Sequence, residues 1–132
     1  MKTNSKKFNE LTRAEEQVMH ILWDLEKGFV KDVVERFEEP RPAYNTVSTI
    51  IRILEKKGFV SYTPYGNTYE YYPLISREEY TASYLNRFIG RYFSNSYKEL
   101  VSFFTANESL SIGELEEMKR LMDEMIQKKK KP

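Results

Sequence analysis

The side chains best suited to bind another molecule lie in residues 43–57, which have the periodicity of an amphipathic helix. One side of this helix is apolar, and the other carries short hydrogen-bonding and basic side chains without any acid. A helix fits the major groove of DNA, where such groups can match base edges and also bind phosphates. The residues expected to face DNA are Asn45, Thr46, Ser48, Thr49, Arg52 and Lys56. An ordinary solvated helix face is the alternative.

Three neighbouring segments extend this surface less clearly. Arg41, just before the helix, is expected either to pair with a phosphate or to cap the turn. Residues 65–68, which include Asn67, are expected to lie against DNA or to form a plain hairpin tip, since they hold no Lys or Arg. At the amino terminus, Lys2, Lys6 and Lys7 are expected to lie in a disordered, solvated segment. Contact of these lysines with phosphate is the alternative.

Catalytic and metal chemistry find little support in the residue types. The chain has no cysteine and one histidine, which excludes thiolate sites and multi-histidine metal sites. His20 is interpreted as a surface or half-buried side chain. No glycine-rich phosphate loop, serine nucleophile elbow or carboxylate cluster at metal spacing occurs. We expect no enzyme, no cofactor and no metal.

Composition limits the class of protein further. With 132 residues and 40% apolar residues, the chain can form one domain, or a small domain with an appendage. No apolar run approaches the ~18 residues of a membrane span, and the start lacks the apolar region of a secretory signal. The sequence therefore predicts a cytoplasmic protein. Its formal net charge of +1 does not by itself indicate a nucleic-acid binder, so that prediction depends on the pattern.

Two earlier helices and a hairpin would position the polar helix. Thr12 and Glu15 form a capping box, followed by an apolar stripe at Ala14, Val18, Ile21, Leu22 and Leu25, and Gly28 is expected to end this helix in the left-handed conformation. A short helix is predicted over residues 30–37, before two prolines. Strands are predicted over residues 59–63 and 68–72, with Gly66 and Asn67 supplying positive φ angles. This order predicts a mostly α fold with a small β-hairpin: a winged helix-turn-helix domain over residues 1–75.

Residues 76–132 change to long helices. Capping boxes begin at Ser76 and Ser111, an aromatic stripe runs from Tyr80 to Tyr92, and an apolar seam at nearly heptad spacing follows Ser111. These helices offer more apolar surface than the segment can bury on itself, so we predict a helical dimerisation domain. The residues expected at the homodimer interface are Tyr84, Phe88, Leu115, Met118, Leu121, Met122 and Met125.

These motifs together resemble the penicillinase repressor family (BlaI/MecI/CopY type) over nearly the whole chain. The matching stretches are residues 11–15, 18–19, 21–23, 46–59 and 71–74. The resemblance implies a homodimeric repressor that binds a palindromic operator through the third helix. Members of the family control operons that include those for antibiotic resistance. Thr46 and Thr49 match threonines of the staphylococcal type, whereas Asn45 and Ser48 stand where those relatives carry basic side chains.

The resemblance also implies a route of induction. Relatives are commonly encoded beside a membrane-bound sensor protease, and are cleaved in the carboxy-terminal domain, typically at an Asn-Phe bond. The corresponding residues here are Ser102, Phe103 and Phe104, with Phe103 in the asparagine position. Copper sensing by cysteine pairs is excluded, because the chain has none.

Two other interpretations stay open at this point. One is a winged-helix regulator of another family, in which the Tyr/Phe helix lines an effector pocket. The other is a winged-helix module that binds protein and not DNA, which the near-neutral charge permits.

Overall fold

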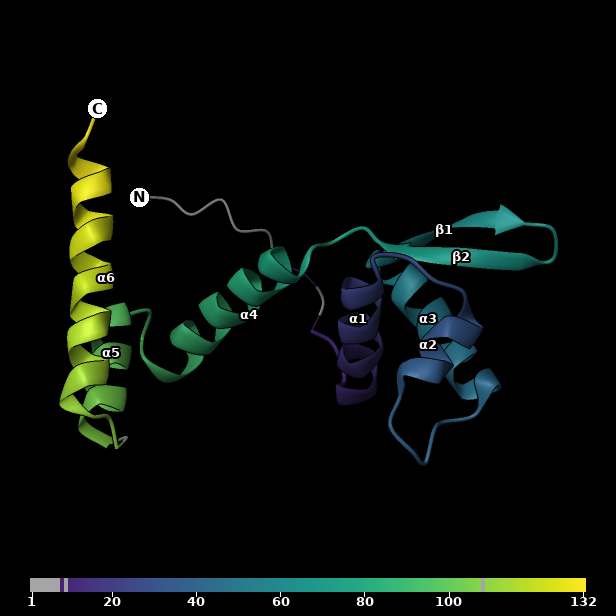
Figure 1. Ribbon diagram of the computed structural model, residues 1–132, viewed down its shortest axis with the longest axis horizontal. Coiled ribbons are helices and arrows are strands. Elements are labelled where there is room, and N and C mark those ends of the chain that lie inside the picture. Colours follow the sequence, from purple (N-terminus) through teal and green to yellow (C-terminus); the bar gives the residue numbers. More distant parts are fainter. Residues whose placement is uncertain (1–7, 9, 108) are drawn as a thin grey trace. The chain divides into compact units, whose positions relative to one another are not determined.

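The computed structural model describes residue 8, residues 10–107 and residues 109–132; Lys2, Lys6 and Lys7 lie outside these residues. Six helices and two strands follow one another in the described part of the chain (Figure 1): α1 Arg13–Leu25, α2 Val30–Arg36, α3 Tyr44–Lys56, β1 Val60–Tyr65, β2 Thr68–Pro73, α4 Arg77–Tyr92, α5 Tyr97–Asn107 and α6 Ile112–Lys130. The predicted fold class, a mostly helical winged helix with a β-hairpin, is confirmed. The chain separates into two compact units, Met1–Arg87 and Phe88–Pro132.

The boundary between these units falls inside α4, later than residue 75. Tyr80, in the first turn of α4, is 6% exposed and belongs to the core of the first unit. Its hydroxyl accepts a hydrogen bond from the Leu11 amide at 3.1 Å. The start of α4 therefore packs with the winged helix, while the functional division at residue 75 stays a prediction.

Helix α1 begins at the predicted capping box. The Thr12 amide donates to Glu15 Oε1 at 3.0 Å, and the Glu15 amide donates to Thr12 Oγ1 at 3.2 Å. The predicted stripe is wrong at its first position, because Ala14 is exposed and Glu15 is buried. The helix presents the face that carries Val18, Met19 and Leu22 to the core, and Glu15 lies on that face.

Gly28 does not have the role predicted for it. Glu26 ends α1 with a φ of 71°, and its amide donates to the Leu22 carbonyl. Gly28 instead pairs with Tyr71 of β2 through two backbone hydrogen bonds of 2.9 and 2.8 Å. The loop before α2 thus adds a one-residue bridge to the edge of the hairpin.

The hairpin directly follows α3. Strands β1 and β2 are antiparallel, with Val60 opposite Pro73 and Tyr65 opposite Thr68, so a two-residue turn joins them. Gly66 has the expected positive φ of 61°, whereas Asn67 does not share it. A single left-handed residue suffices, because a turn with glycine first needs positive φ only there. The core beneath includes fully buried side chains from α1, from α3 and from Phe59 just before β1: Val18, Leu22, Val47, Ile51, Leu54 and Phe59.

The second unit contains the rest of α4 and helices α5 and α6. The capping box at Ser111 is confirmed: its amide donates to Glu114 Oε1 at 2.9 Å, and the Glu114 amide donates to Ser111 Oγ at 3.0 Å. The box at Ser76, which lies in the first unit, is also confirmed, with Glu79 as the reciprocal partner. No residue of α5 or α6 is buried. Within the described residues, no helix is long and apolar enough to cross a membrane.

Candidate nucleic-acid interface

Helix α3 has two faces of opposite character. Val47, Ile51 and Leu54 are fully buried on one side. On the other side the predicted DNA-facing residues are open to solvent: Asn45, Thr46, Thr49, Arg52 and Lys56 are exposed, and Ser48 is half-buried. The helix is held by its apolar side, which leaves the polar side free to contact another molecule.

The first turn of α3 favours an anion. Ala43 is the N-cap residue and has no side chain that could accept a hydrogen bond from the helix amides. The first turn also contains no acidic residue. Unpaired amides and the positive end of the helix dipole attract phosphate.

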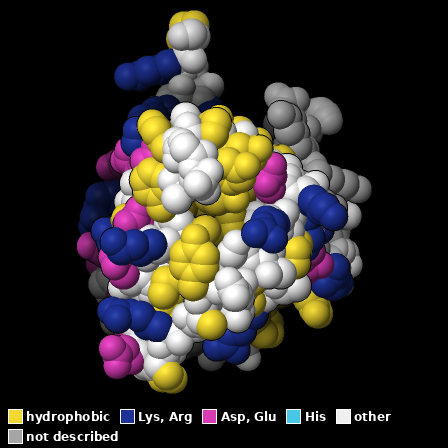
Figure 2. Space-filling model, turned by 90° about the vertical axis from the view of Figure 1, so that its right-hand side faces the viewer, with side chains coloured by type: hydrophobic (Ala, Val, Ile, Leu, Met, Phe, Trp, Pro, Cys, Tyr) yellow, Lys and Arg dark blue, Asp and Glu magenta, His cyan; other side chains and the backbone are white. Residues whose placement is uncertain are grey.

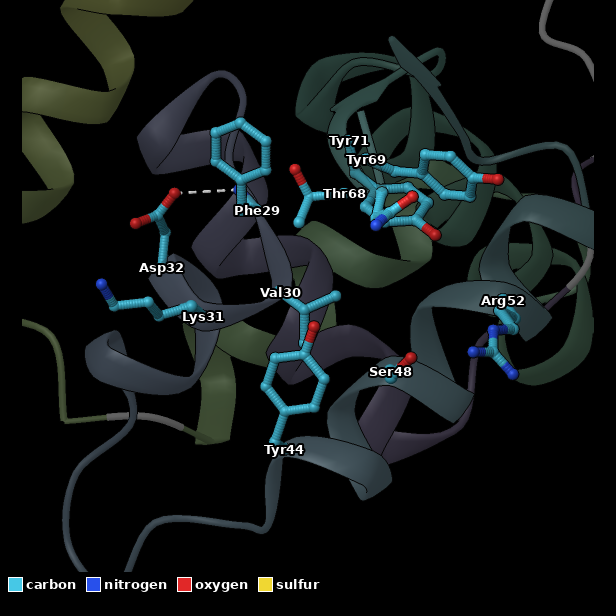
Figure 3. Close-up of a pocket in the computed structure, with 11 residues that line it drawn as sticks. Phe29, Val30, Lys31, Asp32, Tyr44, Ser48, Arg52, Thr68, Tyr69 and Tyr71 are labelled. Carbon is cyan, nitrogen blue, oxygen red and sulfur yellow. Dashed lines mark hydrogen bonds between the residues drawn. The ribbon is translucent and has the colours of Figure 1, made fainter. Parts of the chain in front are cut away.

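A groove runs between α3 and the hairpin (Figure 3). Its volume is about 380 Å³. The predicted residues Ser48, Arg52 and Asn67 are brought together along it, whereas the other predicted contacts lie outside its lining. Figure 3 shows Tyr44, Ser48 and Arg52 extending from α3, with Thr68, Tyr69 and Tyr71 coming from β2. Helix and hairpin together therefore form one concave surface.

The lining also contains residues that were not predicted as contacts, among them Tyr44, Tyr69 and Lys31. Tyr44 is 54% exposed and stands one turn before Ser48 and two turns before Arg52, so its spacing could have identified it. Tyr69 is 43% exposed on β2. Lys31, near the start of α2, supplies an exposed cation that no sequence pattern connects with α3. Beside it, Asp32 accepts a hydrogen bond from the Phe29 amide at 2.9 Å, which fixes the start of α2 (Figure 3).

The Tyr71 hydroxyl in the groove lining stays uncharged. Burial raises the pKa of the Tyr71 hydroxyl above its ordinary value, and the Glu55 carboxylate raises it further, while the Arg52 guanidinium opposes the shift. Tyr71 thus remains a neutral phenol at physiological pH. The groove then depends on Arg52 and Lys31 for positive charge.

Arg41 caps the end of α2. Its Nε donates to the Phe37 carbonyl at 3.1 Å, and its Nη2 donates to the Glu35 carbonyl at 3.3 Å. Nη1 lies 3.6 Å from Glu39 Oε2 in an exposed ion pair. The turn-capping alternative for Arg41 is therefore the one with contacts in the structure, and a phosphate contact stays a prediction.

Aromatic rings stiffen the hairpin. Tyr62 and Tyr69 stack across the strands with ring centroids 4.1 Å apart. Tyr65, near the tip, meets Phe29 edge-on at 5.9 Å. Seen from the hairpin end, this face of the protein carries hydrophobic side chains with both basic and acidic side chains around them (Figure 2). Cross-strand aromatic pairs of this kind stabilise a hairpin that has only two strands.

The remaining predicted residues lie in or near the second unit. The predicted interface side chains include exposed Leu121, Met122 and Met125 on α6, at 59%, 47% and 45%. Leu115, Tyr84 and Phe88 are exposed too, and Met118 is half-buried. Ser102 and Phe103 are exposed and Phe104 is half-buried, all within α5. Among the described residues, no group of three or more His, Cys, Asp or Glu could hold a metal ion.

Comparison with known proteins identifies relatives over most of the chain. The model of a family described as penicillinase repressor matches residues 11–124. The methicillin resistance regulatory protein MecI of Mammaliicoccus sciuri is 27% identical over 118 residues, which cover 89% of this chain and 96% of that protein. The MecI protein of Staphylococcus aureus (strain N315) is 26% identical over the same shares of the two chains.

Two further matches complete this picture. The penicillinase repressor of Bacillus licheniformis is 25% identical over 126 residues, covering 95% of this chain and 98% of that protein. The solution structure of the DNA binding domain of the repressor BlaI aligns with a TM-score of 0.49 and 25% identity, covering 57% of this chain and 93% of that one. The curated relatives are named as a regulatory protein and a repressor, not as enzymes, which agrees with the expectation of a non-enzyme.

Proposed function

Since this chain belongs to the penicillinase repressor family, we propose that it is a transcriptional repressor that binds operator DNA through α3 and the groove beside the hairpin. The observation that carries the proposal is the division of α3 into a buried apolar face and an exposed face of hydrogen-bonding and basic residues. Side chains of this kind can be matched to base edges when the helix enters a major groove.

The contacts are assigned by position along α3. Asn45, Thr46 and Thr49 face the bases, while Arg52 and Lys56 bind phosphates toward the end of the helix. One DNA strand enters the groove between α3 and the hairpin. Ser48 and Tyr44 contact this DNA strand from α3, and Asn67 and Tyr69 contact it from the hairpin. Hydroxyl and amide groups displace fewer counterions from the DNA phosphates than lysines would. Each half-site therefore binds a single winged helix weakly.

Weak half-sites make dimerisation necessary for repression. We infer a homodimer in which the exposed apolar face of α6, which includes Leu121, Met122 and Met125, meets its counterpart. Linking two heads makes the second contact intramolecular and strengthens binding about 10²–10⁴-fold. A two-fold dimer requires a palindromic operator, with half-sites one helical turn or a multiple apart.

Induction is proposed to separate the heads. A membrane-bound sensor protease, or a protease under its control, would cut α5 between Ser102 and Phe104, and the cut would remove the dimer seam of α6 from the winged helix. Phe103 is 53% exposed. The bond lies inside a helix, so this part of α5 must open before a protease can bind it in extended form.

Selection of bound DNA from a random pool tests the proposed function. The full chain is used, and the matched control is the same chain with Arg52→Ala and Thr49→Ala, two exposed positions whose loss leaves the core intact. We expect an enriched palindrome with the parent chain and none with the control. If no DNA sequence is enriched even at low salt, where phosphate contacts are strongest, the chain is instead a module that binds protein.

A further inference from the structure

A small pocket in the first unit lies apart from the groove beside α3. Three residues of α1 and three of α4 line it: Glu16, His20, Trp23, Tyr80, Thr81 and Tyr84. All of them belong to the unit Met1–Arg87. Its volume of about 150 Å³ matches that of an engineered cavity in another protein that admits one benzene molecule. The pocket therefore has room for one small group.

Aromatic rings make up most of the walls. His20 meets Trp23 edge-on, with ring centroids 5.4 Å apart. Trp23 and Tyr80 are 6.3 Å apart and tilted by 37°, and Tyr80 and Tyr84 are 6.3 Å apart and tilted by 35°. The faces of Trp and Tyr rings carry a partial negative charge and attract a cation within about 6 Å of the ring centroid. A row of neighbouring rings adds these attractions together.

Two of the rings are held in place by hydrogen bonds. Trp23 Nε1 donates to the Ile75 carbonyl at 2.8 Å. The Tyr80 hydroxyl accepts from the Leu11 amide at 3.1 Å. Tyr84, at 45% exposed, forms the outer wall. Because the inner walls are already ordered, binding there costs little further conformational entropy.

The charge of the pocket favours a cation. Glu16 is half-buried and is the one carboxylate in the lining, and it forms no ion pair with another described residue. No Lys or Arg lines the pocket. Arg77 lies outside it, where its guanidinium carbon is 5.6 Å from the centroid of a Trp23 ring and its Nη2 pairs with Asp24 at 2.8 Å. Trp23 therefore already stabilises one cation, which lies outside the pocket.

We propose that this pocket binds a quaternary ammonium group. Such a group carries a positive charge but no hydrogen-bond donor. It therefore gives up no donated hydrogen bonds to water when aromatic rings surround it. A primary ammonium would lose hydrogen bonds to water that these walls offer few acceptors to replace. Glu16 supplies the opposing charge at the side of α1. This binding does not depend on the proposed repressor function.

Titration with choline and with tetramethylammonium tests the proposal on the full chain. Trp23 is the single tryptophan, so its fluorescence reports directly on the pocket. The control ligand is the neutral analogue of choline in which carbon replaces nitrogen, at the same ionic strength. We expect a saturable change with both cations and at least fivefold weaker binding of the neutral analogue. Equal binding of the analogue, or no saturable change with either cation, would overturn the proposal.

Variants locate the binding. Tyr84→Leu and Glu16→Gln should each weaken choline binding at least fivefold, and Tyr84→Phe should retain it. The matched control is Tyr92→Leu, which removes another tyrosine of α4 that is 65% exposed and does not line the pocket. Circular dichroism confirms that each variant is folded. Loss of binding in Tyr92→Leu, or full binding in Tyr84→Leu, would contradict the assignment.

Vesicles of phosphatidylcholine distinguish the source of the group. Binding of free choline without co-sedimentation of the protein assigns a soluble ligand. Co-sedimentation that Tyr84→Leu abolishes assigns a lipid headgroup. The proposal fails if neither choline nor tetramethylammonium binds, even where the vesicles co-sediment with the protein.

Discussion

Lys57, the C-cap residue of α3, donates a hydrogen bond from Nζ to Glu15 Oε1 at 2.7 Å. The Glu15 side chain is 7% exposed and that of Lys57 is 26% exposed. The same carboxylate oxygen accepts the Thr12 amide at the start of α1. One charged group thus joins the beginning of α1 to the end of the helix proposed to read DNA.

Removing the lysine should destabilise the first unit. In Lys57→Met the Glu15 carboxylate stays buried without its partner, and we expect a loss of about 1–2 kcal/mol, less than for a fully buried pair because water reaches Lys57. Urea unfolding followed by Trp23 fluorescence measures it. The matched control is Lys56→Met, an exposed neighbour that should leave stability unchanged and weaken DNA binding.

The same pair predicts a dependence on acid. Burial raises the pKa of Glu15, but the hydrogen bond and charge of Lys57 and the Thr12 contacts outweigh it, so the pKa lies below its ordinary value of 4.5. A lowered folded-state pKa stabilises the protein above the unfolded value, and this contribution is lost as the pH falls through the folded one. The difference between parent and Lys57→Met should therefore be full at pH 7 and shrink below about pH 4.5. A difference that stays constant down to pH 3 would contradict this reading.

Arg52 should contribute to DNA affinity and to its salt dependence. Arg52→Ala removes one phosphate contact from each half-site, so the slope of log affinity against log salt should fall by about 1.8 for a dimer. Affinity at moderate salt should fall about tenfold or more. Fluorescence anisotropy with the selected operator measures both quantities. Arg120→Ala on α6 is the control, and an unchanged slope in Arg52→Ala would place Arg52 away from DNA.

Charges placed on the apolar face of α6 should separate the dimer. Leu121→Asp with Met122→Asp puts two carboxylates where apolar side chains are proposed to meet, and light scattering should then give the mass of one chain. Arg120→Asp with Gln127→Asp adds the same residues on the opposite side of the heptad pattern and should remain dimeric. A dimer that persists in the first variant would move the interface to the aromatic residues of α4.

Induction should leave a defined fragment. In cells that contain the sensor protease, mass spectrometry after induction should detect fragments ending at Ser102 or Phe103, and none before induction. Derepression with the chain intact would exclude cleavage as the switch. The rings of Phe103 and Phe93 meet edge-on, with their centroids 5.6 Å apart. Phe103→Leu keeps an apolar contact there and tests whether cleavage depends on the aromatic side chain at the bond.

Local patterns predicted the elements well, and contacts between distant residues escaped them. The capping boxes at Thr12, Ser76 and Ser111 are confirmed, because each depends on residues only three positions apart. The burial of Glu15 was missed, since its partner lies 42 positions away. Helical periodicity finds the apolar stripe but does not reveal a charged residue that is buried beside it.

The candidate interface divides in the same way. The polar face of α3 follows from spacing within one helix, and so would Tyr44, which repeats that spacing. Lys31 and Tyr69 reach the groove only because α2 packs against α3 and β2 packs against α1 and α2, and nothing local to either segment encodes that packing. Gly28 was expected to end a helix because glycine commonly does, but its backbone serves the hairpin edge instead.

The pairing of Gly28 with Tyr71 also bears on how readily the protein engages a duplex. Two mutual hydrogen bonds tie the hairpin to the loop that leads into α2, so these two parts of the groove lining keep their separation before any nucleic acid arrives. The ordering entropy is incurred during folding and not upon association, which favours tighter binding to a duplex whose backbone already fits that fixed width.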